Sequence, residues 1–206
     1  MQKNQRIMKQ LAPVLFLFAL ACSDGEPASM DASVLPGPAL PGAKRIFATS
    51  NKYDGNMVFS TGRTGLDGAD RLCTAAAQAA TLGGTWLALL SEESLAGDAL
   101  ARIEDVGPWY LVGTETVVFD RRADLAGDSL VPIDRDELGR ETTGELDEFF
   151  AWKGRFDGST IEMDCVDWTS NSDREEGYVG LVSDTGSVWT YTFSCDMLAR
   201  IYCIEQ

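Results

Sequence analysis

The stretch CDMLARIYCIE, Cys195–Glu205, joins two cysteines to a mostly apolar segment that predicts a strand over Arg200–Glu205. Two further cysteines, Cys73 and Cys165, lie upstream, the first in a predicted helix. Behind an export signal, four cysteines predict two disulfides, and their number alone allows three pairings. The pattern indicates a folded extracytoplasmic module and does not indicate a chemical reaction.

Residues 1–21 are predicted to be a bacterial lipoprotein signal peptide. Three basic residues precede an apolar run, Leu11–Leu20, that is short for a membrane span. Small residues then precede Cys22, although the usual leucine three positions before that cysteine is Ala19 here. We expect Cys22 to be the lipidated first residue of the mature protein. The alternative is an ordinary secretory signal cut nearby, which leaves Cys22 as an odd thiol.

Residues 22–42 are predicted to form a lipidated tether. Four prolines stand there among small and polar residues, a composition that builds no core. Acyl chains on Cys22 would anchor the protein at an outer membrane or cell surface, or within the periplasm. The remainder, 43–206, has the length of one domain with a single core.

The charge of the chain limits its partners. The formal net charge is −15, and the signal segment holds three of the basic residues and no acid, so the mature protein is more acidic still. Such a surface repels nucleic acid, heparin-like polyanions and anionic lipid. We therefore expect contact with a membrane through the lipid anchor only.

The absence of histidine argues against an enzyme. Histidine is the commonest general base at neutral pH and the commonest metal ligand. Gly127-Asp128-Ser129-Leu130 resembles the nucleophile block of a hydrolase family whose serine needs a histidine, so we treat it as a chance match. A carboxylate pair of the glycosidase kind stays compatible with the composition, but the abundance of acids makes that a weak signal. No catalytic residue is predicted.

The spacing of apolar residues predicts an α+β domain. A strand is expected over Lys44–Thr49, then a helix that starts at Thr64 or Asp67 and runs to about Leu82, where Gly83-Gly84 follows. A second helix is expected after Ser91, ending before Gly107-Pro108. Further strand candidates are 85–90, 109–112, 116–119, 162–168, 178–182, 188–193 and 200–205. The expected architecture is two helices on a small, mostly antiparallel, twisted sheet with long loops.

The long acidic segment Asp120–Glu148 is a candidate metal loop. Calcium takes hard oxygen ligands from such loops, and Asp134, Asp136 and Glu137 are the candidates here. Their spacing fits no EF-hand. The alternative is a solvated loop without metal, and no other cofactor is expected.

Six motifs then follow one another: GLDGAD (65–70), GGTWLALLS (83–91), PIDRDEL (132–138), WKG (152–154), DCVDW (164–168), and Cys195 with YCIE (202–205). This order resembles the C-terminal endostatin domain of collagens XV and XVIII, and bacterial surface lipoprotein domains of unknown function that share it. The resemblance covers roughly Lys44–Gln206. It implies a C-type-lectin-like fold and a nested disulfide pattern, Cys73 with Cys203 and Cys165 with Cys195.

The known functions of those relatives do not carry over. Sugar-binding C-type lectins hold calcium with a Glu-Pro-Asn or Gln-Pro-Asp block, which this chain lacks, and Val188–Tyr191 lacks the Asn and Asp of a second block. Endostatin uses histidines for zinc and arginines for heparin, whereas this chain has no histidine and is acidic.

The segment Thr169–Ser187 is the predicted ligand surface. Trp168 and Trp189 flank it, although core packing is the favoured role for each of the five tryptophans. Its candidate ligand-binding residues are Trp168, Asn171, Asp173, Glu175, Glu176 and Trp189.

The predicted function is a non-catalytic binding or adhesion module for an extracellular protein or glycan. The alternatives are a structural, disulfide-stapled envelope protein and, less favoured, an enzyme of the copper oxidase kind, which would need free cysteines.

Overall fold

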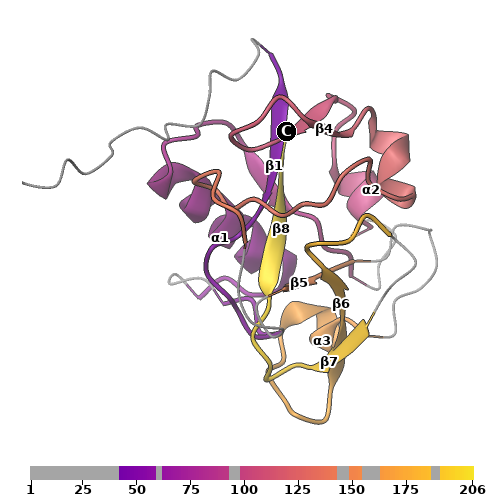
Figure 1. The fold of residues 1–206 in the computed structure, drawn as a ribbon. Helices are drawn as coiled ribbons and strands as arrows, with labels where there is room; N and C mark the ends of the chain where they lie inside the picture. Colours follow the sequence, from indigo (N-terminus) through magenta and orange to yellow (C-terminus); the bar gives the residue numbers. More distant parts are fainter. Residues whose placement is uncertain (1–41, 59–61, 93–97, 143–148, 155–162, 187–190) are drawn as a thin grey trace, which may run out of the picture. The chain divides into compact units, whose positions relative to one another are not determined.

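A computed structural model describes residues 42–58, 62–92, 98–142, 149–154, 163–186 and 191–206, and all structural statements concern these residues. They form an α+β structure dominated by an eight-stranded sheet (Figure 1). The elements in chain order are β1 (Lys44–Ala48), α1 (Gly65–Ala79), β2 (Trp86–Ala88), α2 (Ala99–Arg102), β3 (Trp109–Leu111), β4 (Val117–Phe119), η2 (Arg122–Ala126), β5 (Phe150–Trp152), α3 (Cys165–Trp168), β6 (Glu176–Leu181), β7 (Tyr191–Ser194) and β8 (Arg200–Glu205).

Strand β8 is the centre of the sheet. The strand order is β4-β3-β1-β8-β5-β6-β7, and β2 also pairs with β8. The β1–β3 and β5–β8 pairs are parallel and the other pairs are antiparallel, as expected for a mostly antiparallel sheet. Every residue of β8 is buried, because the sheet is covered on both faces. The predicted strand over Arg200–Glu205 is confirmed at both ends.

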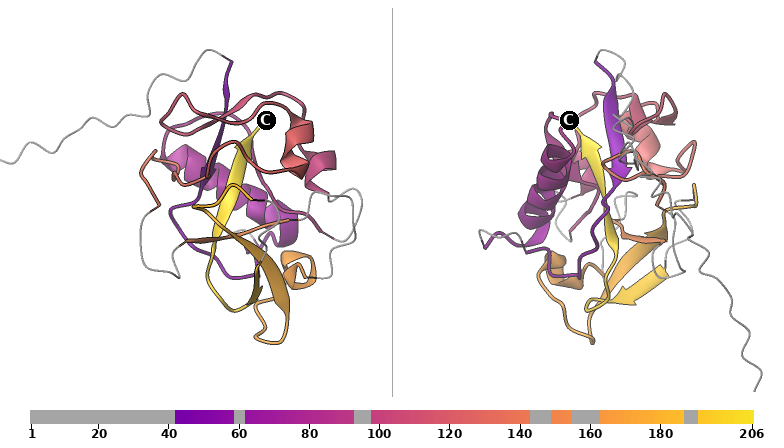
Figure 2. Two further views of the ribbon diagram at one scale, coloured as in Figure 1. Left: turned by 45° about the vertical axis from the view of Figure 1, so that its right-hand side comes forward. Right: turned by 60° about the vertical axis from the view of Figure 1, so that its left-hand side comes forward.

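Side chains of β8 alternate between two cores. Ile201 and Cys203 belong to the core under α1, together with Trp86, Trp152 and Trp168 among others. Tyr202 and Ile204 belong to a second core on the other face. We call these the α1-side core and the loop-side core. Figure 2 shows α1 on one side of β8 and β1, with α2, η2 and their connections on the other.

Helix α1 lies close to the sheet because its inner face is made of small residues. Ala69, Cys73 and Ala77 are fully buried. A side chain at Gly68 would clash with the carbonyl oxygen of Met57, so only glycine allows this approach. The helix starts after Thr64 as expected but ends at Ala79, three residues earlier than the sequence indicated.

Two disulfides fasten the sheet. Cys73 on α1 bonds Cys203 on β8, and Cys165 bonds Cys195. This is the nested pairing that the resemblance implies. The first disulfide ties the long helix to the central strand, and the second closes the chain around β6 and β7.

One predicted strand is wrong, and one predicted helix is shorter than expected. A strand was expected over 162–168. Residues Cys165–Trp168 instead form a left-handed turn, in which all four residues have φ between 53° and 59°. Such conformations cost L-residues roughly 1–2 kcal/mol each. The second helix is shorter than expected over its described part, and its N-cap is Asp98, whose carboxylate accepts the Leu100 N–H at 2.7 Å. Ser91 still contributes, since its hydroxyl accepts the Ala99 N–H at 3.1 Å.

Among the described helices, none is long and apolar enough to cross a membrane. The signal segment, Cys22 and the tether up to residue 41 lie outside the described residues, so their predictions stay predictions.

Candidate functional site

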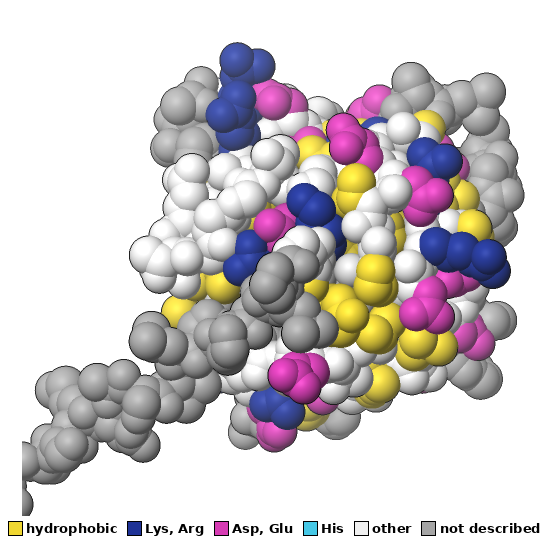
Figure 3. Space-filling view, turned by 90° about the horizontal axis from the view of Figure 1, so that it is seen from above, with side chains coloured by type: hydrophobic (Ala, Val, Ile, Leu, Met, Phe, Trp, Pro, Cys, Tyr) yellow, Lys and Arg dark blue, Asp and Glu magenta, His cyan; other side chains and the backbone are white. Residues whose placement is uncertain are grey.

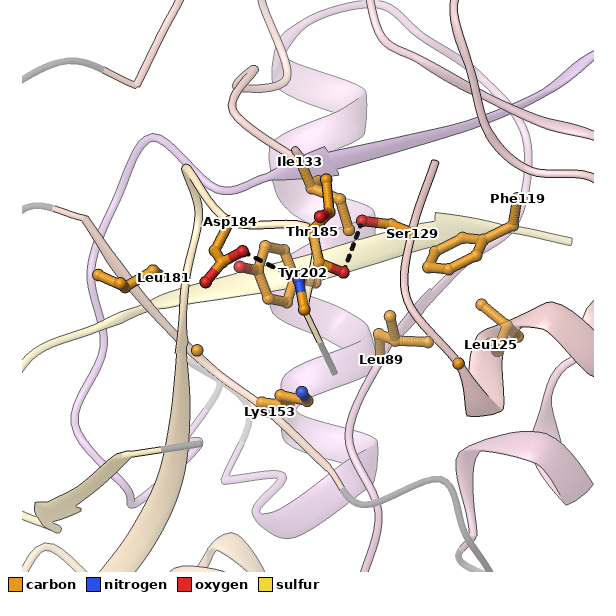
Figure 4. Close-up of a pocket in the computed structure, with 13 residues that line it drawn as sticks. Leu89, Phe119, Leu125, Ser129, Ile133, Lys153, Leu181, Asp184, Thr185 and Tyr202 are labelled. Carbon is orange, nitrogen blue, oxygen red and sulfur yellow. Dashed lines mark hydrogen bonds between the residues drawn. The ribbon is translucent and has the colours of Figure 1, made fainter. Parts of the chain in front are cut away.

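A half-open pocket of about 50 Å³ lies on the loop side of the sheet (Figure 4). Strands β6 and β8 supply its floor, and the connections around 119–133 and 184–186 supply its walls. Its lining residues are Leu89, Phe119, Leu125, Gly127, Ser129, Ile133, Lys153, Gly180, Leu181, Asp184, Thr185, Gly186 and Tyr202.

Backbone pairing sets the positions of the floor residues. Tyr202 stands opposite Ala48 in the β1–β8 ladder, and its carbonyl accepts the Leu89 N–H at 2.8 Å. Gly180 stands opposite Ala151 in the β5–β6 ladder. A Cβ at Gly180 would lie 3.4 Å from Cδ of Lys153 and 4.0 Å from the Tyr202 hydroxyl. The missing side chain at Gly180 therefore helps to keep the pocket open.

The two walls of the pocket are joined to each other. The Ser129 N–H donates to the carbonyl oxygen of Thr185 at 2.9 Å, and the Ser129 hydroxyl approaches the same oxygen at 3.4 Å. The Asp184 carboxylate accepts the Gly186 N–H at 3.1 Å, which holds the turn after β6. These bonds fix both connections over the sheet, so the pocket is a built feature of the fold.

Tyr202 is the most unusual polar group in the pocket. The residue is 7% exposed, and its hydroxyl donates no hydrogen bond to a described residue. Burial, and then the negative charge of Asp184, raise the pKa of the phenol well above its usual value, so it stays protonated. Figure 4 shows Tyr202 and Asp184 pointing toward one another. The hydroxyl oxygen is not among the enclosed atoms without a partner, so the O–H reaches the open space of the pocket and can donate to a bound acceptor.

Lys153 supplies a cation between two acids. Burial lowers the pKa of its ammonium group, and the charges of Asp128 and Asp184 oppose that shift. The backbone N–H of Lys153 donates to the Tyr178 carbonyl at 2.9 Å, which fixes the start of the side chain beside β6. The electrostatic environment therefore combines one positive and two negative charges.

The pocket contains a motif that the sequence interpretation set aside. Gly127 and Ser129 of the Gly127-Asp128-Ser129-Leu130 block line it, and Asp128 interacts electrostatically with Lys153. The block was treated as a chance match because no histidine exists. Its resemblance to a hydrolase motif carries no catalytic argument, but its position in the pocket was not foreseen. The WKG motif at residues 152–154 served only as part of the family resemblance, and no sequence signal identified Lys153 as a pocket residue.

The predicted ligand residues lie elsewhere on the surface. Asp173, Glu175 and Glu176 are exposed, and the Asn171 amide donates to Asp54 at 3.3 Å. None of these four residues lines the pocket, although Asp184–Gly186, from the end of the predicted segment Thr169–Ser187, does.

Trp168 requires a correction. Its side chain is fully buried in the α1-side core, and its indole N–H donates to the Ser91 carbonyl at 2.7 Å. It therefore packs the core and contacts no surface ligand, because the left-handed turn Cys165–Trp168 directs it inward. Trp189 lies outside the described residues.

The three calcium candidates have separate protein partners. Asp136 accepts the N–H groups of Leu138 and Arg140, both at 2.9 Å, and pairs with the Arg140 guanidinium at 2.7 Å. Glu137 accepts the Ser50 N–H at 2.8 Å and the Ser50 hydroxyl. Asp134 lies 3.6 Å from the Arg135 guanidinium. No cluster of three or more acidic or cysteine side chains able to hold a metal occurs within the described ranges. Calcium at this loop stays a prediction.

The surface seen from the top of Figure 1 has interspersed charges. Figure 3 shows Lys and Arg side chains among Asp and Glu on this face, with hydrophobic side chains gathered between them. The exposed large hydrophobic residues of the 120–142 connection are Leu130 and Leu138, at 61% and 39% exposure. The acidic excess of the chain is therefore not a uniform single-sign surface on this face.

No protein-family model matches the chain, and no curated protein sequence matches it significantly.

Proposed function

We propose that this protein is a lipid-anchored extracytoplasmic binding or adhesion module without catalytic activity, with an extracellular glycan or protein as its partner. The observation that carries the proposal is the pocket beside β6 and β8, in which the hydroxyl of the largely buried Tyr202 donates to no described residue. Small-molecule sites are typically concave and mostly apolar with a few oriented polar groups, and this pocket has that composition.

The C-type-lectin-like fold of the endostatin type is part of the same proposal. The nested disulfides and the central C-terminal strand support it, as does the cover of long connections on one sheet face. In this proposal the lipid on Cys22 and the tether 22–42 hold the domain away from a membrane, so that the pocket meets soluble or surface partners.

A binding array tests this function. The full-length oxidised protein is applied to broad glycan and extracellular-protein arrays, beside a Gly180→Val variant that fills the pocket. Saturable binding that the variant weakens is the expected result. Absence of any saturable ligand on both arrays would contradict the proposal.

A structural envelope role is the second candidate, favoured by the two disulfides and four fully buried tryptophans. Such a role needs no ligand at the pocket. It predicts that Gly180→Val leaves the behaviour of the envelope unchanged, whereas removal of the disulfides weakens it. Measuring envelope integrity in cells that carry each variant separates the two functions.

A further inference from the structure

The size of the pocket limits what can enter it. A water molecule needs roughly 10–15 Å³ of such space, so a pocket of about 50 Å³ accommodates roughly four non-hydrogen atoms. A whole sugar ring or a large side chain exceeds that volume. A small substituent of a larger molecule fits, with the rest of that molecule outside the half-open mouth.

The polar side of the pocket presents a donor and an acceptor. Tyr202 is a largely buried residue whose O–H donates to no described residue and is not among the enclosed atoms without a partner, so it reaches the pocket and is available to a ligand oxygen. The Asp184 carboxylate lies toward it in Figure 4 and uses one oxygen, Oδ1, for the Gly186 N–H. A secondary amide offers the matching pair, a carbonyl oxygen that accepts and an N–H that donates.

The charges around the pocket disfavour an anionic ligand. Asp128 and Asp184 both interact electrostatically with Lys153, so a carboxylate would meet two like charges and one opposite charge. A neutral amide avoids that repulsion and still bonds to the polar groups.

The opposite side of the pocket is apolar. Leu89, Phe119 and Leu125 lie together there in Figure 4, across from Tyr202 and Asp184. A methyl group attached to the amide carbonyl would contact these side chains while the amide faces the polar side. Methyl, carbonyl and N–H in this order make an acetamido group.

We infer, resting on the binding role proposed above, that the pocket receives the acetamido group of an N-acetylated amino sugar. The polar lining favours a sugar over a peptide as the carrier. Ser129, Thr185 and Lys153 line the pocket with hydroxyl and ammonium groups, which suit the hydroxyls of a sugar ring.

The test is a titration of the full-length oxidised protein followed by the methyl NMR signals of Leu89 and Leu125. The probe is the methyl glycoside of N-acetylglucosamine. Controls are methyl glucoside, which lacks the acetamido group, and N-acetylglycine methylamide, which presents the same group on a peptide. We expect saturable shifts at millimolar concentration, as for a small ligand with few contacts, and at least tenfold weaker binding of methyl glucoside.

Three variants assign the binding to the pocket. Tyr202→Phe removes only the hydroxyl and is expected to weaken binding at least fivefold. Gly180→Val fills the space beside Lys153 and Tyr202 and is expected to abolish the shifts. Tyr191→Phe, on the exposed strand β7, is the matched control and is expected to bind as the unmodified protein does. Thermal unfolding of each variant shows that lost binding is not lost folding.

Each contrary result has a defined meaning. Equal binding of methyl glucoside, or shifts that persist in Gly180→Val, would overturn the acetamido site. Tighter binding of the peptide probe would overturn the choice of a sugar. An array ligand that is indifferent to Gly180→Val and to added N-acetylglucosamine glycoside would overturn this inference and leave the binding function intact. No ligand in either experiment would overturn both.

Discussion

The two faces of the sheet are built differently. The α1-side core is covered by a regular helix and contains both disulfides. It also buries three tryptophans, Trp86, Trp152 and Trp168, each of which is at most 1% exposed. The loop-side core is covered by short helical turns and long connections, and it leaves the pocket next to Tyr202. The same strand, β8, supplies alternate side chains to both.

This difference shows where the molecule can accommodate a ligand. A helix whose inner face is made of small residues lies close to a sheet and covers it evenly. Irregular connections cover a surface less evenly, so a hollow can persist there. Stability and recognition are thus divided between the faces, and four predictions test that division.

The largest effect is expected from the Cys73–Cys203 disulfide, which ties α1 to β8. Removing Cys73–Cys203 by a double alanine substitution frees a loop of sequence separation 130 and should cost about 5 kcal/mol of unfolding free energy in the chain-entropy model. Removing Cys165–Cys195, with separation 30, should cost about 3.6 kcal/mol. Relief of the left-handed turn at Cys165 would reduce the second cost further. Denaturant unfolding of both variants measures which disulfide contributes more to the unfolding free energy. A larger loss of unfolding free energy on removal of Cys165–Cys195 would refute the prediction.

The next effect compares leucines in the two cores. Leu90 is fully buried in the α1-side core, and Leu125 is equally buried but borders the pocket. Leu90→Ala should cost about 4 kcal/mol, because it leaves a closed cavity. Leu125→Ala should cost about 2 kcal/mol, because it only enlarges an existing opening that water can enter. Equal midpoints in urea unfolding would show that the loop side is packed as tightly as the helix side.

A smaller effect depends on pH and concerns Asp164, the residue before the left-handed turn. Its Oδ1 accepts the Asp167 N–H at 3.0 Å, whereas Oδ2 is buried without a partner. Burial, with a further contribution from the charge of Asp167, raises the pKa of Asp164, so the folded state holds its proton more tightly than the unfolded state. The stabilisation of the folded state by this tighter proton binding is fully present below the unfolded pKa of 3.8. It is lost as pH rises through the higher pKa that Asp164 has in the folded state.

Asp164→Asn keeps the size of the side chain and removes that charge. It should therefore stabilise the protein by about 1 kcal/mol at pH 7 and have no effect near pH 3. Urea unfolding across this range measures the difference, with the exposed Asp173→Asn as control. A gain of the same size at both pH values would show that the charge is not its cause.

The smallest effect is expected at Tyr202. Tyr202→Phe removes a hydroxyl that donates to no described residue, so the unfolding free energy should be unchanged or raised by up to about 1 kcal/mol. Thr49→Val is the matched control. The buried Thr49 hydroxyl donates to the Asn51 carbonyl at 2.7 Å and accepts the Ile201 N–H at 2.9 Å, so its loss should cost about 1–3 kcal/mol. Thermal and denaturant unfolding of both variants compare a satisfied hydroxyl with an unsatisfied one.

Much of the fold was predictable because it depends on local patterns. Apolar spacing identified α1, and runs of β-branched and aromatic residues identified β8 within its true bounds. The pairing of Cys73 with Cys203 followed from the resemblance, since four cysteines alone leave three pairings open. The segment 162–168 was misread because its apolar residues suggested a strand, whereas Asp164, the disulfide at Cys165 and contacts with Met57 hold it in a left-handed turn.

The candidate site was only partly predictable. Exposed polar residues such as Asp173 and Glu175 attracted attention because a loop rich in them is typical of binding surfaces. The pocket instead takes Tyr202 from a central strand, Lys153 from the end of β5 and Ser129 from a distant connection. No spacing rule relates these positions, because they meet only through sheet pairing and loop packing.

The sequence by itself determined the α+β class, the charge, the number of disulfides and the main strand, since these depend on residue type and on neighbours along the chain. Only the tertiary structure decided that Trp168 is buried, that the acids at 134, 136 and 137 bind different partners, and that a hollow remains over β8. The physical reason is that burial, hydrogen-bond satisfaction and empty space belong to sets of residues far apart in the chain. They exist only once the strands have paired and both faces of the sheet are covered.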